Sequence, residues 1–261
     1  MKLQVLVAAV NQSVTKLADT MNLESDAIIV NQCDKNEYEE YLHKGRKIRC
    51  YSFAERGVGL NRNNGLMRAD TDICLFSDED IVLQTGYEEA ILKEYEMHPE
   101  ADMLIFNLKV DERRATYYNT QFKRIRWYNY GRYPTYSVSA KTKELHRTGV
   151  SFSLLFGGGA KYSNGEDSLF LHDCLKKGLK IYASTVVIGE ETYRESTWFN
   201  GYNQKFFVDR GVLYHFLYGK LAHVFALRFL LAHKAEMCQE LSVGEAYRYM
   251  KKGIAEGKGA V

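Results

Sequence analysis

Residues 73–80 of this chain are Ile73-Cys74-Leu75-Phe76-Ser77-Asp78-Glu79-Asp80, an apolar run that ends in acidic residues. The apolar part has the length and composition of a buried strand. In open α/β sheets, ligands bind beyond the carboxyl ends of the strands, which is where Asp78 and Asp80 would lie. Two carboxylates spaced i, i+2 in a loop can bind one Mg²⁺ or Mn²⁺, with phosphate oxygens completing the ligand shell. The stretch therefore predicts a metal and phosphate site at the edge of a sheet.

The same acidic residues have a simpler explanation, in which they precede a helix and interact with its dipole. A helix is expected soon afterwards, over residues 86–98, because apolar residues recur there at helical spacing before Pro99. For an isolated Asp-x-Asp sequence, this simpler explanation is the commoner one. The rest of the chain has to decide between the two.

Other apolar runs of strand length recur along the chain, separated by amphipathic or polar stretches. They are Leu3–Val10, Ala27–Val30, Ile48–Phe53, Ile73–Phe76, Met103–Leu108 and Lys180–Val187. This alternation is typical of a doubly wound, mostly parallel α/β sheet flanked by helices. Residues 113–136 are basic and aromatic without a clear period, which predicts irregular surface or lid structure. Beyond Trp198 the chain is helical in pattern, so we expect a domain over residues 1–198 and a helical extension over 199–261.

Composition excludes several classes of protein. The 35 basic and 33 acidic residues leave a net charge of +2, so no global field favours nucleic acid. Five cysteines without a CxxC pair argue against a disulfide framework and favour the reducing cytoplasm. The N-terminal run resembles a first strand more than a signal peptide. Four cationic or histidine side chains interrupt the apolar residues 212–231, which argues against a transmembrane helix.

Two glycine-containing segments are the other candidates for a site. The first is Arg56-Gly57-Val58-Gly59-Leu60-Asn61-Arg62-Asn63-Asn64-Gly65-Leu66, where backbone N–H groups and Arg62 could share an anion, although a tight turn with a solvated arginine explains the spacing equally well. The second is Phe156-Gly157-Gly158-Gly159-Ala160-Lys161-Tyr162-Ser163-Asn164-Gly165-Glu166-Asp167, followed by a helix to about Lys177. Asn164 and Asp167 have the spacing of a capping box. Asp167 also lies at a helix start beside a glycine loop, a suitable place for a general base.

In this order, the three segments resemble glycosyltransferase family 2, whose members have the GT-A fold, a Rossmann-like and mostly parallel sheet flanked by helices. Residues 57–66 resemble the family's glycine-leucine-serine and arginine-asparagine segment, with Gly59 where serine is usual. Residues 73–80 resemble its DxD strand, and Gly165-Glu166-Asp167 its Gly-Glu-Asp motif. The resemblance covers roughly residues 3–202. Residues 195–202 also resemble a stretch found in bacterial relatives of surface-polysaccharide synthesis.

The resemblance implies an inverting transfer of a sugar from a nucleotide sugar, expected to be a UDP-sugar, to a glycan or lipid-linked saccharide in capsular or exopolysaccharide synthesis. It implies that Asp78 and Asp80 bind Mn²⁺ or Mg²⁺ and the donor diphosphate. Glu191 and His215 are candidates for a third metal ligand. Asp167 would be the catalytic base, with Glu166 beside it in the same motif.

The remaining site residues also follow from the resemblance. The donor pocket would be lined by Ala8, Val10, Asn11, Asn31, Arg62, Asn63, Ser77 and Asp78. Two departures leave the nucleobase open: Val10-Asn11-Gln12 replaces a proline-containing motif, and Asn31 stands where aspartate is common. The acceptor would meet Gly158, Gly159 and Trp198, the last through stacking on a sugar face. The aromatic and basic residues 123–136 are a further candidate for the acceptor platform, or ordinary loop packing.

Other functions and partners stay open. A sugar nucleotidyltransferase would need a glycine-rich, lysine-bearing loop after the first strand, where this chain has Asn11-Gln12-Ser13-Val14. A binding or scaffold protein that keeps the fold without turnover is the non-enzyme alternative. The apolar, basic C-terminal helices could rest peripherally on the inner face of a membrane, cover the sheet, or make a homodimer.

Overall fold

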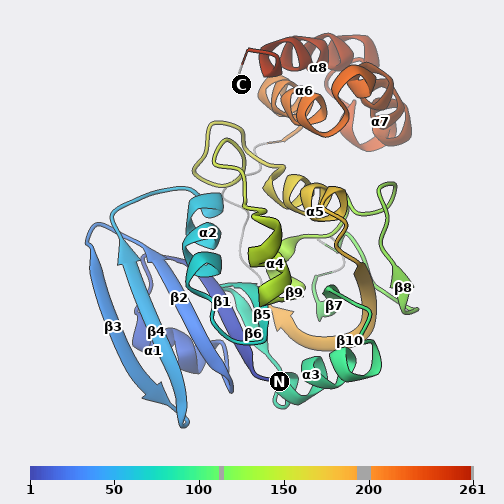
Figure 1. Ribbon diagram of the computed structural model, residues 1–261. Coiled ribbons are helices and arrows are strands. Elements are labelled where there is room, and N and C mark those ends of the chain that lie inside the picture. Colours follow the sequence, from blue (N-terminus) through green and yellow to red (C-terminus); the bar gives the residue numbers. More distant parts are fainter. Residues whose placement is uncertain (112–114, 193–200, 260–261) are drawn as a thin grey trace.

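One mixed sheet forms the centre of the molecule in the computed structural model, which describes residues 1–111, 115–192 and 201–259 (Figure 1). Its order is β3-β4-β2-β1-β5-β9-β7-β10-β6, with β8 beside β10. The strands are β1 (Leu3–Val10), β2 (Asp26–Gln32), β3 (Glu37–His43), β4 (Arg46–Phe53), β5 (Ile73–Asp78), β6 (Ile81–Leu83), β7 (Met103–Lys109), β8 (Lys123–Arg124), β9 (Val138–Lys141) and β10 (Ile181–Glu191).

Helices cover both faces of this sheet and form a separate group at the C-terminus (Figure 1). They are α1 (Val14–Thr20), α2 (Val58–Arg68), α3 (Tyr87–Met97), α4 (Thr142–Thr148), α5 (Glu166–Lys176), α6 (Gln204–Tyr218), α7 (Ala222–Met237) and α8 (Val243–Gly257), with short 3₁₀ turns η1 (Thr135–Ser137) and η2 (Gly219–Leu221). The predicted α/β architecture with a helical C-terminal region is therefore confirmed.

Side chains of each central strand alternate between two cores, because successive residues of a strand point to opposite faces. In β1, Val5 and Val7 belong to the core that α1 and α3 cover, whereas Leu6 belongs to the core under α2, α4 and α5. Burial on both faces explains why the central strands are continuous apolar runs in the sequence.

The strands β4, β2, β1 and β5 run parallel, so their carboxyl ends meet at one edge. In the register of this block, Ala8 lies beside Asp78 and Val10 lies beside Gln32. The acidic residues of the β5 end are thereby placed next to the end of β1. This edge is where the sequence predicted the site.

Several strands differ from the parallel pattern, including β6 and β8, which pair antiparallel with β10. β9 is inserted antiparallel between β5 and β7. β3 pairs antiparallel with β4 at the sheet edge, and its side chains are mostly exposed and charged. An edge strand with few buried side chains has no apolar run, which is why the sequence pattern did not reveal it.

The helical extension packs on the sheet-bearing part through a third core. Phe156, Tyr162 and Leu169 from the first part are buried with Phe207 and Leu213 of α6. The predicted boundary at residue 198 falls outside the described residues. None of the helices in the described ranges is long and apolar enough to cross a membrane.

Candidate active site

A cavity of about 700 Å³ opens at the carboxyl edge of the parallel strands. Its wall combines segments that are distant in sequence: the ends of β1 and β5, the start of α2, residues 131–136, the 158–159 loop with the start of α5, and the first half of α6. Among its lining residues are Ala8, Val10, Arg62, Asp78, Asp80, Tyr136, Gly158, Gly159, Glu166, Asp167 and Arg210.

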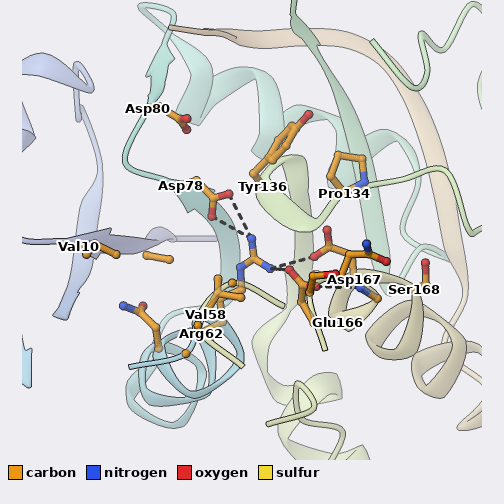
Figure 2. A pocket seen from close by; sticks show the side chains of 18 of the residues that line it. Val10, Val58, Arg62, Asp78, Asp80, Pro134, Tyr136, Glu166, Asp167 and Ser168 are labelled. Atoms are coloured by element: carbon orange, nitrogen blue, oxygen red, sulfur yellow. Dashed lines mark hydrogen bonds and ion pairs between the residues drawn. The ribbon is translucent and has the colours of Figure 1, made fainter. Parts of the chain in front are cut away.

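Arg62 is the centre of this site (Figure 2). Its guanidinium lies 3.0 Å from Asp78, 2.9 Å from Asp167 and 3.5 Å from Glu166, measured between nitrogen and carboxylate oxygen. Only 5% of the arginine side chain is exposed. One buried cation thus connects the predicted metal-binding carboxylate with the predicted base, which are 89 positions apart in sequence (167 − 78).

The helix α2 holds Arg62 in place through side chains that bond to backbone. The Asn61 amide donates to the carbonyls of Ala9 (3.3 Å) and Val30 (2.8 Å). Gly59 stands where the family usually has serine, and a Cβ there would lie 2.2 Å from the Ser153 carbonyl oxygen. The glycine is therefore required by the close approach of the 153 loop to α2.

The carboxylates and Arg62 change one another's ionisation. Burial by itself lowers the pKa of Arg62, but Asp78, Asp167 and Glu166 outweigh it and hold that pKa above its ordinary value. Burial and repulsion from Asp167 raise the pKa of Glu166 to about 7, against the opposing effect of Arg62. Arg62 is therefore always charged, while Glu166 retains a proton in part of the molecules near neutral pH.

Asp167 lies in the first turn of α5, and its side chain is 26% exposed. Its Oδ1 accepts hydrogen bonds from Arg62 and from the Thr135 hydroxyl. Within the described ranges, no donor is bonded to the other oxygen, Oδ2. The expected capping box is wrong, because α5 is capped by Gly165 at φ 123° with no side-chain bond.

Asp78 and Asp80 both line the cavity (Figure 2). Asp78 accepts from Arg62 through both oxygens, at 3.0 and 3.2 Å. β6 follows directly, and α3 begins only at Tyr87, so the two aspartates do not begin a helix. The helix-dipole explanation of the acidic run is therefore wrong.

The donor set at Asp78 and Asp80 suits a hard divalent cation, since carboxylate oxygens are its preferred ligands. Over the described ranges, no group of three or more His, Cys, Asp or Glu side chains is placed to hold a metal ion. Glu191 ends β10 opposite Ile81, and His215 packs on Gly257 in the extension, away from the cavity lining. Two protein carboxylates fit such an ion only if a ligand, such as a diphosphate, supplies further oxygens.

Four of the predicted donor residues, Ala8, Val10, Arg62 and Asp78, line the cavity, and four others lie outside it. Asn31 instead clamps the loop after β1, because its side chain exchanges hydrogen bonds of 3.0 and 3.1 Å with the Gln12 backbone. Asn63 bonds both backbone groups of Phe152 at 2.7 and 2.9 Å. Ser77 is buried, and Asn11 adopts φ 52° with its N–H on the Gln32 carbonyl.

Of the residues predicted to meet the acceptor, Gly158 and Gly159 line the cavity, and Trp198 lies outside the described residues. The Gly158 carbonyl accepts the Val58 N–H at 2.9 Å, and a Cβ on Gly159 would lie 3.1 Å from the Gly57 nitrogen. These glycines therefore let the 157–159 loop approach the start of α2. Glu79, for which the sequence suggested no role, accepts the Val10 N–H at 2.7 Å and so supports the end of β1.

Further lining residues come from the stretch that was expected to be irregular surface or lid, namely Thr116, Arg132, Tyr133, Pro134 and Tyr136. The last four lie within residues 123–136, the candidate acceptor platform, whereas sequence reasoning missed Thr116. The expectation of irregular surface or lid structure is wrong in part, because Tyr133 is buried. Burial, with the Glu191 carboxylate nearby, raises the pKa of Tyr136, so its phenol stays protonated.

The extension supplies the other lining residues that were missed, namely Asn203, Lys205, Phe206 and Arg210. No periodic pattern marks the residues of either group as part of a site. Only the basic and aromatic composition of the lining residues within 116–136 suggested a site.

Known proteins resemble this chain in sequence and in fold. TarS of S. aureus, residues 1–349 with UDP-GlcNAc, is similar with a TM-score of 0.64 and 15% identity over 92% of this chain and 74% of TarS. The structure of the same protein with UDP has a TM-score of 0.63 and 13% identity, over 100% of this chain and 83% of TarS. The mannosyltransferase PcManGT of Pyrobaculum calidifontis, in complex with GDP-Man and Mn²⁺, has a TM-score of 0.52 and 12% identity, over 100% of this chain and 76% of PcManGT.

At these identities the structural likeness concerns the fold, and no curated protein matches the sequence. The sequence profile of glycosyl transferase family 2 matches residues 7–157, which is more than half of the chain and includes α2 and β5. The profile match, the GT-A-like sheet and the cluster around Arg62 agree, and the chain belongs to glycosyl transferase family 2.

Proposed function

We propose that this protein transfers a sugar from a nucleoside diphosphate sugar, with UDP as the expected nucleotide, to an acceptor hydroxyl with inversion at the anomeric carbon. The observation that carries the proposal is the link through Arg62, which holds Asp78 and Asp167 at one cavity. A single displacement needs a binding site for the leaving diphosphate and a base for the attacking hydroxyl, held in one geometry. Asp167 can act as the base, and Asp78 could bind the diphosphate through a divalent cation.

Asp167 is the base in this proposal. Arg62 and Thr135 both donate to its Oδ1, which orients the carboxylate and leaves Oδ2 for the acceptor. The acceptor oxygen gives its proton to Asp167 and bonds to the anomeric carbon as the bond from that carbon to the diphosphate oxygen breaks. Glu166, partly protonated, limits the negative charge around Asp167.

Asp78 and Asp80 are the residues that would hold Mn²⁺ or Mg²⁺. Such an ion, when bound, neutralises the charge that develops on the diphosphate leaving group. Asp78 stays fixed by Arg62, and its side chain is 29% exposed toward the cavity. Support for a metal also comes from PcManGT, which shares the fold and whose structure is a complex with GDP-Man and Mn²⁺.

The acceptor we propose is a glycan or lipid-linked saccharide of a bacterial surface polysaccharide. It would enter along Gly158 and Gly159, which line the cavity. The nucleotide sugar would lie along Ala8 and Val10, toward the end of β1. The complexes of TarS with UDP and with UDP-GlcNAc support a uridine nucleotide.

The test is turnover of a panel of UDP-sugars with Mn²⁺, comparing wild type with Asp167→Asn. The variant should lose about 10²–10⁴-fold in rate, the usual contribution of a general base, and keep its affinity for UDP. Asp173→Asn, on the exposed side of the same helix, is the matched control and should keep its activity. Near-normal activity of Asp167→Asn would reject the base. Wild-type protein that binds UDP without transfer or hydrolysis would favour the scaffold alternative.

A further inference from the structure

Arg210 is a cation of the cavity wall that the proposed chemistry does not use. It lies on α6 and lines the same cavity as Asp78 and Asp167. The sequence offered no motif around it. Its position in the helical extension separates it from the residues that match the family's motifs.

The contacts of Arg210 leave its donors available. Its guanidinium carbon lies 5.3 Å from the ring centres of Phe206 and of Phe229. Throughout the described ranges, no carboxylate lies within 4.0 Å of it, and its buried Nε makes no hydrogen bond. Aromatic rings interact with the face of a guanidinium, so the N–H groups at its edge keep their capacity to bind an anion.

The nearest acidic neighbour in sequence is already occupied. Asp209 accepts from the backbone N–H of Ser163 at 2.9 Å and from its hydroxyl at 2.8 Å, and it pairs with Lys205 at 2.5 Å. Arg62, another arginine of the cavity wall, is shared among three carboxylates. A guanidinium that is removed from water and lacks a counter-ion costs free energy, which a bound anion would recover.

Arg210 lies on the acceptor side of the base. Leu213, one helical turn later on α6, contacts the loop before α5, since a Cβ on Gly165 would meet it at 2.7 Å. Residues three apart share one face of a helix, so Arg210 faces the same region as Leu213. Gly165 is two residues before Asp167, which must contact the acceptor hydroxyl.

We infer that Arg210 binds an anionic group of the acceptor, a phosphate ester or a carboxylate close to the hydroxyl that receives the sugar. The inference rests on the proposed function, and it names the class of acceptor as an acidic saccharide. Guanidinium N–H groups match the oxygens of both anions. Arg132, exposed at the same cavity, adds positive charge near the entering anion.

The experiment measures binding of glucose, glucose 6-phosphate and glucuronate to wild type and variants by saturation-transfer NMR, with and without UDP and Mn²⁺. The three probes differ only in the group at carbon 6. Glucose 6-phosphate, glucuronate or both should bind more tightly than glucose, and the stronger probe identifies the anion. Arg210→Gln should reduce this preference about tenfold, as expected when a charge-assisted hydrogen bond is lost.

Control variants separate a binding role from a structural one. Arg210→Lys keeps the charge and should recover part of the preference, whereas Arg147→Gln, an exposed arginine of α4, should behave as wild type. Affinity for UDP with Mn²⁺ should be the same in all variants. Equal binding of the three probes to wild type would overturn the inference, and so would a preference that survives Arg210→Gln.

Weaker UDP binding in Arg210→Gln would assign Arg210 to the donor and overturn the inference as well. Failure of wild type to bind UDP would instead count against the proposed function. In that case, the preference measured without UDP still decides the role of Arg210.

Discussion

Glu166 shows how burial and a neighbouring carboxylate set the protonation of a side chain. Burial and repulsion from Asp167 raise the pKa of Glu166 to about 7, and the nearby Arg62 guanidinium only partly opposes this effect. The folded protein therefore holds a proton on Glu166 between about pH 4.5 and 7, where the unfolded chain does not. Stability from this residue is complete below about pH 4.5 and is lost as the pH rises to about 7.

Glu166→Gln should remove the loss of stability that occurs as the pH rises from about 4.5 to 7. In metal-free buffer, the wild-type free energy of unfolding should fall between pH 4.5 and 7 by on the order of 2 kcal/mol more than that of the variant. Urea unfolding at several pH values measures the difference. Parallel pH profiles for the two proteins would contradict the raised pKa.

A substitution of Asp80 tests the predicted metal site. Asp80→Asn removes one of two carboxylates available to the cation, so Mn²⁺-dependent affinity for UDP should fall at least about tenfold. Calorimetry with UDP, with Mn²⁺ and with EDTA, measures the effect. Asp19→Asn, an exposed residue of α1, is the control. Wild-type affinity that does not change with Mn²⁺ would reject the metal site.

Between elements, the contact of α6 with α8 depends on glycines. A Cβ on Gly253 would lie 2.0 Å from the Val208 carbonyl oxygen, and one on Gly211 would lie 2.1 Å from that of Met250. Gly253→Ala should push the helices apart and cost about 1–3 kcal/mol. Gly244→Ala, in the first turn of α8, meets no atom closer than 4.0 Å and should be neutral or stabilising. Thermal unfolding distinguishes them, and equal midpoints would contradict the close packing.

Some secondary-structure elements could be predicted from local sequence patterns, and others could not. Buried strands such as β1 and β5 were found from their apolar runs, and α3 and α5 from their spacing and their ends. β9 and β3 were not found, because pairing with a distant strand leaves little local signal. The start of α5 at Glu166 was also found, but its cap was not, since Gly165 at positive φ caps the helix in place of Asn164.

At the scale of the whole molecule, an exposed apolar stripe is formed by Leu221 at the end of η2 and by Val224, Leu227 and Leu231 of α7, each 44–63% exposed. Arg228 and Lys234 flank it on the helix surface, which suits an anionic membrane. We propose that the stripe rests on such a membrane. Leu227→Glu should reduce co-sedimentation with phosphatidylglycerol-containing vesicles several-fold.

The control is the same substitution at another exposed leucine, Leu42→Glu on β3. It should leave vesicle binding unchanged, and vesicles of phosphatidylcholine alone should bind both proteins less. A wild type that does not bind vesicles would reject the proposal. A monomer–dimer equilibrium that Leu227→Glu abolishes would assign the stripe to a homodimer instead.

The sequence by itself determined the family, the central strands and the positions of Asp78, Asp80, Arg62 and Asp167 in three motifs, because each of these signals is local and lies within a few residues. Tertiary structure alone decided that Arg62 joins Asp78 to Asp167, that Asn31 and Asn63 bind backbone, and that Arg210 enters the cavity from the extension. Such relations depend on how distant segments pack, and no spacing along the chain encodes them.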